Sequence, residues 1–242
     1  NCASYTIWNG ASWSNGTPDN TKRVIVRNDL TISNDMTACE LLVQSGIVNV
    51  NSGATFTVEG EIYNTQTAAN FIVESDANLI QLDDVENIGA ITVKRNSFPL
   101  YRQDYTLWAS PVAGQNLRAF SPQTVFSRFY SYDTAAGTAG EYEQELFTTA
   151  DTQTKTFAIA KGYMIRMPNN WPEFENETIA GTPFAGSFAG IPNNGNITIP
   201  ISTANTGVNL VGNPYPSSLL MRFLMQILLL IKHYTFGENA TV

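Results

Sequence analysis

Apolar and polar positions alternate over the first hundred residues, in short runs separated by corners. In "SGIVNVN" the apolar positions are Val48 and Val50, and in "SGATFTV" they are Phe56 and Val58. This period of two puts the apolar side chains on one face of a strand. The Ser-Gly pair before each run allows a tight corner, because glycine has no Cβ. The pattern predicts a capped β-solenoid over residues 1–97, and ordinary hairpins are the alternative.

The sequence pattern changes from about Phe98 onward, where the short repeat ends and aromatic residues become frequent. Runs such as "KGYMIRMP", "GSFAGIPNNGNITIPI" and "VNLVGNPYPSS" are strand-like segments interrupted by Gly, Pro and Asn-Gly turns. These features predict a β-sandwich-like module over residues 98–218. The fold class predicted for the chain is therefore all-β, a solenoid followed by a sandwich.

Composition places the chain in an extracellular β-rich class. Charged residues make up only 14% of it, so hydroxyl and amide side chains have to cover much of the surface. The net charge of −8 and the sequence pI near 4.6 repel polyanions, and no basic stripe with interleaved aromatics is present. Nucleic acid is therefore excluded as a partner.

The cysteines of the chain are Cys2 and Cys39. They are either two buried free thiols or a disulfide that closes the N-terminal segment. We predict the disulfide, since the composition points outside the cytoplasm. A bridge over a loop of this length would stabilise the fold by about 4 kcal/mol in the chain-entropy view.

Several motifs along residues 1–218 resemble one group of bacterial proteins. The motifs are "WNGASWSNGTPD", "TACELLV", "SGATFTV", "ITVKRNS", "DYTLWASPV", "KGYMIRMPNN" and "NLVGNPYPSS". In combination and order they resemble the secreted, adhesin-like modular proteins of Bacteroidetes and Flavobacteria. The resemblance implies a secreted or cell-surface protein without a firmly attached activity. It also implies export by type IX secretion, through a sorting domain in a longer parent protein.

Residues 219–242 differ from the rest of the chain in composition, and the apolar run from Leu219 to Ile231 predicts a hydrophobic helix. The run is shorter than the roughly 20 apolar residues of a membrane span, and Arg222 and Gln226 interrupt it. It is either a docking helix over an exposed β edge or a frameshift product that begins near Ser218. We predict the frameshift, because plausible codons for this segment, read in a shifted frame, encode polar and aromatic residues of the kind expected after Ser218. Resequencing of the gene tests this prediction. An intact reading frame, with no sorting domain downstream in any frame, would favour the docking helix instead.

Catalytic residue types are scarce. Residues 1–218 contain no histidine, and the one histidine, His233, lies in the tail. This removes Ser-His-Asp and Cys-His arrangements and the usual zinc sites. No phosphate-binding loop, dinucleotide fingerprint or EF-hand string occurs either. We predict a chain that is not an enzyme, and a polysaccharide-degrading enzyme on a β-helix is the alternative.

Acidic residues offer candidate cation ligands. Asp83, Asp84 and Glu86 form a cluster at an expected corner, where carboxylates and backbone carbonyls suit calcium. Two further rows have the spacing that places three carboxylates on one strand face: Glu141, Glu143 and Glu145, and Glu173, Glu175 and Glu177. Solvated strand faces that discourage edge-to-edge aggregation explain such rows equally well. No other cofactor is expected.

Two residues are candidates for contact with glycans. Trp171, beside "PNN" and Pro172, is the tryptophan most expected to be exposed and to stack on a sugar, although tryptophan is also a good core residue. Thr134, in Asp133-Thr134-Ala135, matches the short O-glycosylation motif of the proteins that the chain resembles. The sequence thus predicts a non-catalytic structural or adhesive region, with surface glycans or cell-surface proteins as partners. A carbohydrate-binding module is the other alternative.

Overall fold

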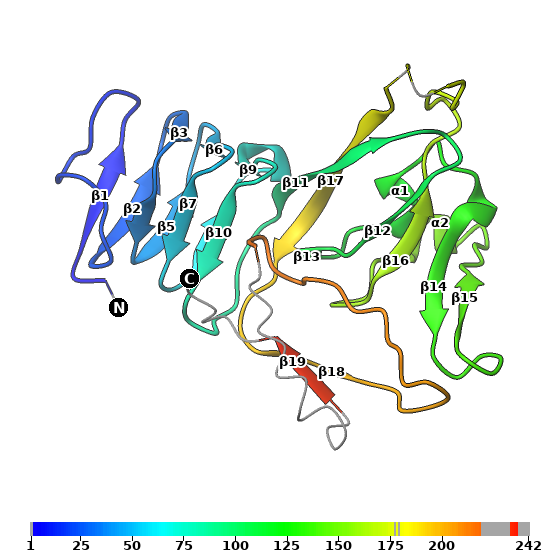
Figure 1. Cartoon of the computed structure of the whole chain (residues 1–242). Helices are drawn as coiled ribbons and strands as arrows, with labels where there is room; N and C mark the ends of the chain where they lie inside the picture. The colour runs from blue at the N-terminus through cyan, green and yellow to red at the C-terminus, as the bar shows by residue number, and fades with distance from the viewer. Residues whose placement is uncertain (1, 177, 179, 219–232, 237–242) are drawn as a thin grey trace.

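The computed structural model describes residues 2–176, 178, 180–218 and 233–236. A β-solenoid of about four turns occupies one end of the molecule and a β-sandwich the other (Figure 1). The predicted all-β class, with a solenoid followed by a sandwich-like module, is confirmed.

Three parallel sheets form the faces of the solenoid. The first face contains β1 (Ser4–Trp8), β2 (Lys22–Val26), β5 (Glu40–Val43) and β8 (Ile62–Asn64). The second begins with β3 (Leu30–Ile32), β6 (Val48–Val50), β9 (Phe71–Val73) and β11 (Ile91–Leu100). The third contains β4 (Met36–Ala38), β7 (Thr55–Val58) and β10 (Asn78–Gln81), and a short 3-10 helix, η1 (Ala68–Asn70), precedes β9.

Stacked apolar ladders fill the interior of the solenoid. Val24 pairs with Leu41 and Leu41 with Ile62, and all three side chains are buried. Phe56 is buried between Met36 and Leu79 on the third face. Each large apolar side chain removed from water contributes about 1.5–3 kcal/mol. The alternation read from the sequence therefore identifies the inward-facing positions.

Glycines form the corners, as predicted. Gly46 has a φ of +78° and Gly53 a φ of +83°, a region that residues with a Cβ rarely adopt. The two near-repeat units "SGIVNVN" and "SGATFTV" form β6 and β7, which are successive faces of one coil. Residues of different coils, such as Val50 and Val73, stack on each other.

Buried amides close the last regular coil. The side chain of Asn87 accepts hydrogen bonds from the backbone N–H of Ile62 and from Gln81, at 3.0 and 2.8 Å. It donates to Gln81 Oε1 and to the carbonyl of Pro192, at 2.7 and 3.1 Å. The apolar ladder thus ends in a satisfied polar cluster that also reaches the second half of the chain.

Strand β11 joins the two halves. Its first residues pair in parallel with β9, and most of its length pairs antiparallel with β17 (Thr182–Pro192). The second face of the solenoid therefore continues into the sandwich, in the order β13-β17-β11-β9-β6-β3. The expected module boundary at residues 97 and 98 falls inside this strand. One buried core extends through both halves.

The sandwich packs a second antiparallel sheet on β11 and β17. That sheet contains β12 (Tyr105–Trp108), β16 (Tyr163–Arg166), β14 (Phe129–Asp133) and β15 (Glu141–Gln144). The connecting elements are β13 (Val112–Ala113), α1 (Leu117–Phe120), η2 (Phe126–Arg128) and α2 (Asp151–Thr154). Trp108 contacts Phe184 and Phe188 of β17, with ring centroids 5.7 and 6.2 Å apart. Aromatic residues thus fill the space between the two sheets.

The predicted helix from Leu219 to Ile231 lies outside the described residues. Beyond it, β19 (His233–Phe236) pairs antiparallel with β18 (Ile197–Pro200). The described part of the tail is therefore a strand.

Candidate functional site: a cleft at the capped end of the solenoid

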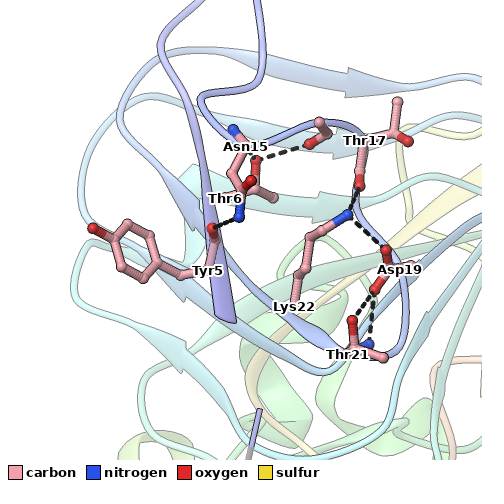
Figure 2. A network of polar contacts seen from close by, with 8 residues as sticks. Tyr5, Thr6, Asn15, Thr17, Asp19, Thr21 and Lys22 are labelled. Atoms are coloured by element: carbon pink, nitrogen blue, oxygen red, sulfur yellow. Dashed lines mark hydrogen bonds and ion pairs between the residues drawn. The ribbon is translucent and has the colours of Figure 1, made fainter. Parts of the chain in front are cut away.

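Strand β1 and the loop that follows it cover the first coil. The buried hydroxyl of Thr6 organises this cap by donating to the carbonyl of Gly16 at 2.9 Å and accepting from the backbone N–H of Asn15 at 3.2 Å. The Asn15 side chain donates to the carbonyl of Tyr5 (Figure 2). The predicted turn at Asn15-Gly16 is therefore part of a loop that hydrogen bonds hold against strand β1.

Lys22 and Asp19 fix the second half of the same loop. Lys22 Nζ lies 2.6 Å from Asp19 Oδ2 and donates to the carbonyl of Thr17 at 2.9 Å (Figure 2). Thr21 donates its backbone N–H and its hydroxyl to Asp19 Oδ1. The hydrogen bond from Lys22, followed by those from Thr21, lowers the pKa of Asp19 from 3.8 to about 2. Asp19 is therefore an ionised acceptor at any physiological pH.

A cleft of about 640 Å³ opens beside this loop. Trp13 and Asp19 line it from the cap, Asp35 from the turn before β4, and Glu59 from the end of β7. Pro18, Asn20, Met36 and Thr37 complete its walls together with Thr17. Asp35 Oδ1 accepts the backbone N–H of Thr55 at 2.9 Å, which fixes that carboxylate on the next coil.

Trp13 is held at the edge of this cleft. Its backbone forms a bridge with Trp8, and the two ring centroids lie 5.0 Å apart. Trp8 donates its indole N–H to the carbonyl of Asp29 at 2.7 Å, which anchors the pair. The cleft therefore combines an aromatic surface with carboxylate and amide groups. An apolar platform with a few fixed polar groups is a common composition of small-ligand sites.

A sequence model of a family described as a domain of unknown function, DUF8693, matches residues 1–229. The chain belongs to the DUF8693 family. No curated protein and no solved structure matches it. The matched region extends past Ser218, and the frameshift near that residue stays a prediction.

The predicted disulfide of this DUF8693 chain is confirmed. Cys2 and Cys39 are bonded, with their Cα atoms 5.7 Å apart. The bond fastens the segment before β1 to the corner between β4 and β5. Within the described residues, Cys2, Cys39 and Glu40 are the one group of three Cys, His, Asp or Glu side chains whose potential metal-ligating atoms all lie within 4.8 Å of one another. Because both sulfurs are in the disulfide, neither is a thiolate ligand.

The three calcium candidates form a turn that packs on the sandwich. Asp83, Asp84 and Glu86 are exposed, and they do not bring their carboxylates together as a group in the described chain. Asn194 donates its side-chain N–H to the carbonyl of Asp83 at 3.2 Å, and Asp84 packs directly on Gly195. The structure therefore gives this turn a role in joining the halves, and these residues stay candidates for calcium binding.

Trp171 and Thr134, the two candidates for contact with glycans, are both held by contacts within the fold. Trp171 packs on Phe184 with centroids 5.6 Å apart and donates its indole N–H to the carbonyl of Thr182. It therefore lies half-buried at the edge of the core, and stacking of a sugar on it stays a hypothesis. Thr134 is 5% exposed, and its hydroxyl donates to the carbonyl of Val208 at 2.6 Å. This contact argues against a glycan on Thr134 in the folded chain.

The acidic row of β15 is only partly a solvated face. Glu141 and Glu143 are exposed, whereas Glu145 forms ion pairs with Lys155 and Lys161. Burial acts to raise the pKa of Glu145, but hydrogen bonds from Lys155 and Ser131 outweigh it and lower this pKa. In the other row, Glu173 pairs with Arg102, and Glu177 lies outside the described residues.

The cap cleft itself was missed at the sequence level. Asp35 and Glu59 are separated along the chain and belong to no motif, so only the coiling of the chain brings them beside Trp13. The one local signal is the density of turn pairs around Trp13.

Among the helices that the structure describes, none has the length and apolar character of a membrane span.

Proposed function

We propose that this chain is a non-catalytic structural or adhesive region of a secreted or cell-surface bacterial protein, which contacts surface glycans through the cap cleft. The observation that carries the proposal is the position of Trp13 beside Asp19, Asp35 and Glu59 at the fastened end of the solenoid. Solenoids present extended, rigid surfaces for binding, and their ends are accessible.

The charge of the cleft selects among glycans. Asp19, Asp35 and Glu59 are all acidic, and Lys22 is already paired with Asp19. An acidic polysaccharide would be repelled, whereas neutral sugar hydroxyls can donate hydrogen bonds to the carboxylates. The ligand class that we propose is therefore a neutral glycan, with one sugar ring on Trp13.

The low pKa of Asp19 argues against a general-acid role for this carboxylate. A glycosidase needs one carboxylic acid whose pKa is raised, so that it can protonate the leaving group. The hydrogen bonds from Lys22 and Thr21 change the pKa of Asp19 in the opposite direction. This carboxylate is suited to accept hydrogen bonds rather than to donate a proton.

The disulfide supports an extracellular location. Cys2–Cys39 requires an oxidising compartment, such as a periplasm or a cell surface, in order to persist. The sequence motifs that resemble secreted Bacteroidetes proteins point the same way.

A glycan array probed with the full chain tests the proposal. We expect retention of neutral glycans but not of acidic ones, with binding lost in Trp13→Ala and weakened in Glu59→Gln. Tyr63→Ala is the matched control, because Tyr63 is an exposed aromatic residue on the outer face of β8, outside the cleft. Equal loss of binding in Tyr63→Ala would refute the assignment to the cleft.

A reducing-sugar assay on the retained polysaccharides tests the non-catalytic part. We expect no turnover by the wild-type chain. Turnover that disappears in Glu59→Gln, or on substitution of Asp83, Asp84 or Glu86, would assign the chain to the polysaccharide-degrading class instead.

A further inference from the structure

The outer face of the first solenoid sheet carries an unbroken row of apolar side chains. Side chains alternate along each strand, so the residues next to the buried ones point outward. Strand register aligns one outward apolar residue from each of β1, β2, β5 and β8, and a bridge extends the row by one more residue. This outer row consists of Ile7, Ile25, Leu42, Tyr63 and Ile88. Tyr63 and Ile88 are 40% and 45% exposed, and the other three side chains are half-buried.

The outward positions of the other two solenoid faces are mostly polar. On the second face the aligned outward residues are Thr31, Asn49, Ile72 and Thr92. On the third face they are Thr37, Thr57 and Ile80. Single apolar residues among hydroxyl and amide groups are ordinary on a protein surface, whereas contiguous apolar surface marks a site of contact with a partner. The outer row therefore makes the first face the contact surface of the solenoid.

Both edges of this sheet are already covered. At β1, Ser14 donates its backbone N–H to the carbonyl of Ile7 at 3.0 Å. Asn15 donates its side-chain N–H to the carbonyl of Tyr5 at 3.1 Å. At β8, the backbone of Ile88 donates one hydrogen bond at 3.0 Å and accepts another at 2.8 Å. These contacts block the addition of a further strand at either edge, so a partner of this sheet packs on its face.

Charged side chains flank the outer row on both sides. On one side, Arg23 of β2 is aligned with Glu40 of β5, and its Nε donates to Glu40 Oε2 at 2.6 Å. On the other side, Arg27 follows β2 and its Nε donates to Gln44 Oε1 at 2.8 Å, just after β5. One flank of the row therefore holds a cation beside an anion, and the other flank holds a cation beside a neutral amide.

A second copy of the chain complements this face. Two identical sheets can pack face to face about a twofold axis that runs either parallel to the strands or along the row, and both orientations place one outer row on the other. With the axis parallel to the strands and between β2 and β5, Arg23 of each copy faces Glu40 of the other. With the axis along the row, Arg23 of one copy faces Arg27 of the other, and the like charges repel. Charge complementarity therefore selects the axis parallel to the strands.

We propose that the chain self-associates as a twofold-symmetric dimer through the outer face of the first sheet. Ile25 of one copy packs on Leu42 of the other, and Ile7 packs on Tyr63. Four strands at about 4.8 Å spacing make the row only about 14 Å wide, so the interface is at the small end for specific contacts and the dimer is weak and reversible. The cap cleft lies beside β4 on the third face, and the inference does not rest on it.

Sedimentation equilibrium of the full chain, from about 1 μM to about 1 mM, tests the proposal. We expect the average mass to rise with concentration from that of the monomer toward twice that value. Leu42→Glu places a charge at the centre of the outer row and should keep the chain monomeric over the whole range. Thr31→Glu is the matched control, because Thr31 is an exposed strand residue of the second face. Its association should equal that of the wild type.

Charge reversal tests the orientation of the two copies. Arg23→Glu should weaken association about tenfold or more, because two carboxylates then face each other across the axis. The double variant Arg23→Glu with Glu40→Arg should restore association, since the exchange recreates the same pairs. Stronger association of Arg23→Glu alone would indicate an axis along the row, where position 23 faces Arg27, and would overturn the proposed dimer.

Other outcomes also contradict the proposal. These are a monomer mass at every concentration of the wild type, a dimer that persists in folded Leu42→Glu, and equal loss of the dimer in Thr31→Glu. Circular dichroism checks that each variant is folded. If Leu42→Glu does not fold, the charge-reversal variants decide, because Arg23 is exposed and its substitution leaves the core intact.

Discussion

At the scale of single residues, the cap is organised by side chains that satisfy the backbone of a loop. Asp19 accepts three hydrogen bonds from Lys22 and Thr21, and Lys22 also donates to the carbonyl of Thr17. Because the ionised form of Asp19 receives these bonds, the pKa of this group is about 2 instead of 3.8. The stabilising contribution of Asp19 is fully present above its ordinary pKa and is lost as the pH falls through the lower value.

Lys22→Gln should raise the pKa of Asp19 toward 3.8, because it removes the largest cause of the shift. The pKa should stay below 3.8, since Thr21 still donates. NMR titration of the Asp19 carboxyl carbon measures it. Arg23→Gln is the control, because Arg23 pairs with Glu40 instead. A pKa of Asp19 that does not change in Lys22→Gln would show that Thr21 alone is responsible.

Substitutions at Gly46 and Gly53 distinguish the cost of an unfavourable backbone conformation from the cost of a steric clash. Both have a positive φ, but a Cβ on Gly46 would lie 2.3 Å from the carbonyl carbon of Asn28, whereas Gly53 faces open space. Gly53→Ala should destabilise the fold by about 1–2 kcal/mol. Gly46→Ala should cost about 3 kcal/mol or more, because the backbone must also shift. Urea unfolding measures both, and equal costs would contradict the packing argument.

At the scale of elements, each strand of the solenoid contributes one or two inward residues to ladders that extend across the coils. Val26 and Val43 are stacked apolar residues of this kind, and the next position in their ladder is Asn64. Asn64 donates to the carbonyls of Thr67 and Ala90, at 2.9 and 2.7 Å. Polar residues can thus replace apolar ones at the last coil, because the chain there leaves the regular path and provides partners.

Asn87→Ala should destabilise the protein by about 2 kcal/mol or more, since it leaves buried groups of Ile62 and Gln81 without partners. Chemical unfolding measures the effect. Asn34→Ala is the control, because Asn34 is exposed, and its stability should match that of the wild type. Equal stability of the two variants would mean that water replaces the lost amide without cost.

At the scale of the whole molecule, one sheet connects the solenoid to the sandwich. Because β11 pairs with β9 on one side and β17 on the other, the two halves share hydrogen bonds as well as a core (Figure 1). The opposite end of the solenoid depends on β1, which covers the first coil and is fastened by Cys2–Cys39. The disulfide therefore stabilises the end of the solenoid at which the cap cleft lies.

Removing both cysteines, in Cys2→Ser with Cys39→Ser, should lower the free energy of unfolding by about 4 kcal/mol, through the loop-closure entropy of the unfolded chain. Unfolding with and without reductant measures this, and reductant should leave the double variant unchanged. Thiol titration of the denatured, unreduced wild type should find no free thiol. Two free thiols in oxidised, secreted material would contradict the disulfide.

Local patterns determine much of the fold. Alternation in "VNV" and "TFTV" identifies the inward residues, and Ser-Gly pairs mark corners, because strand period and glycine conformation are properties of a few neighbouring residues. The cysteine pair was also predicted. The contacts of Trp171 with Phe184 and of Thr134 with Val208 were not predicted, because they depend on distant segments of the chain.

The cap cleft was decided by the tertiary structure alone. Asp35 and Glu59 approach Trp13 because successive coils stack, and the sequence contains no motif that includes them. Gly186 lies opposite Arg95 because β11 pairs with β17 in one register, and its missing Cβ leaves room for the ring of Trp108. The sequence supplies the groups and their local conformation. Pairing between strands that are far apart in the chain sets the distances on which binding depends.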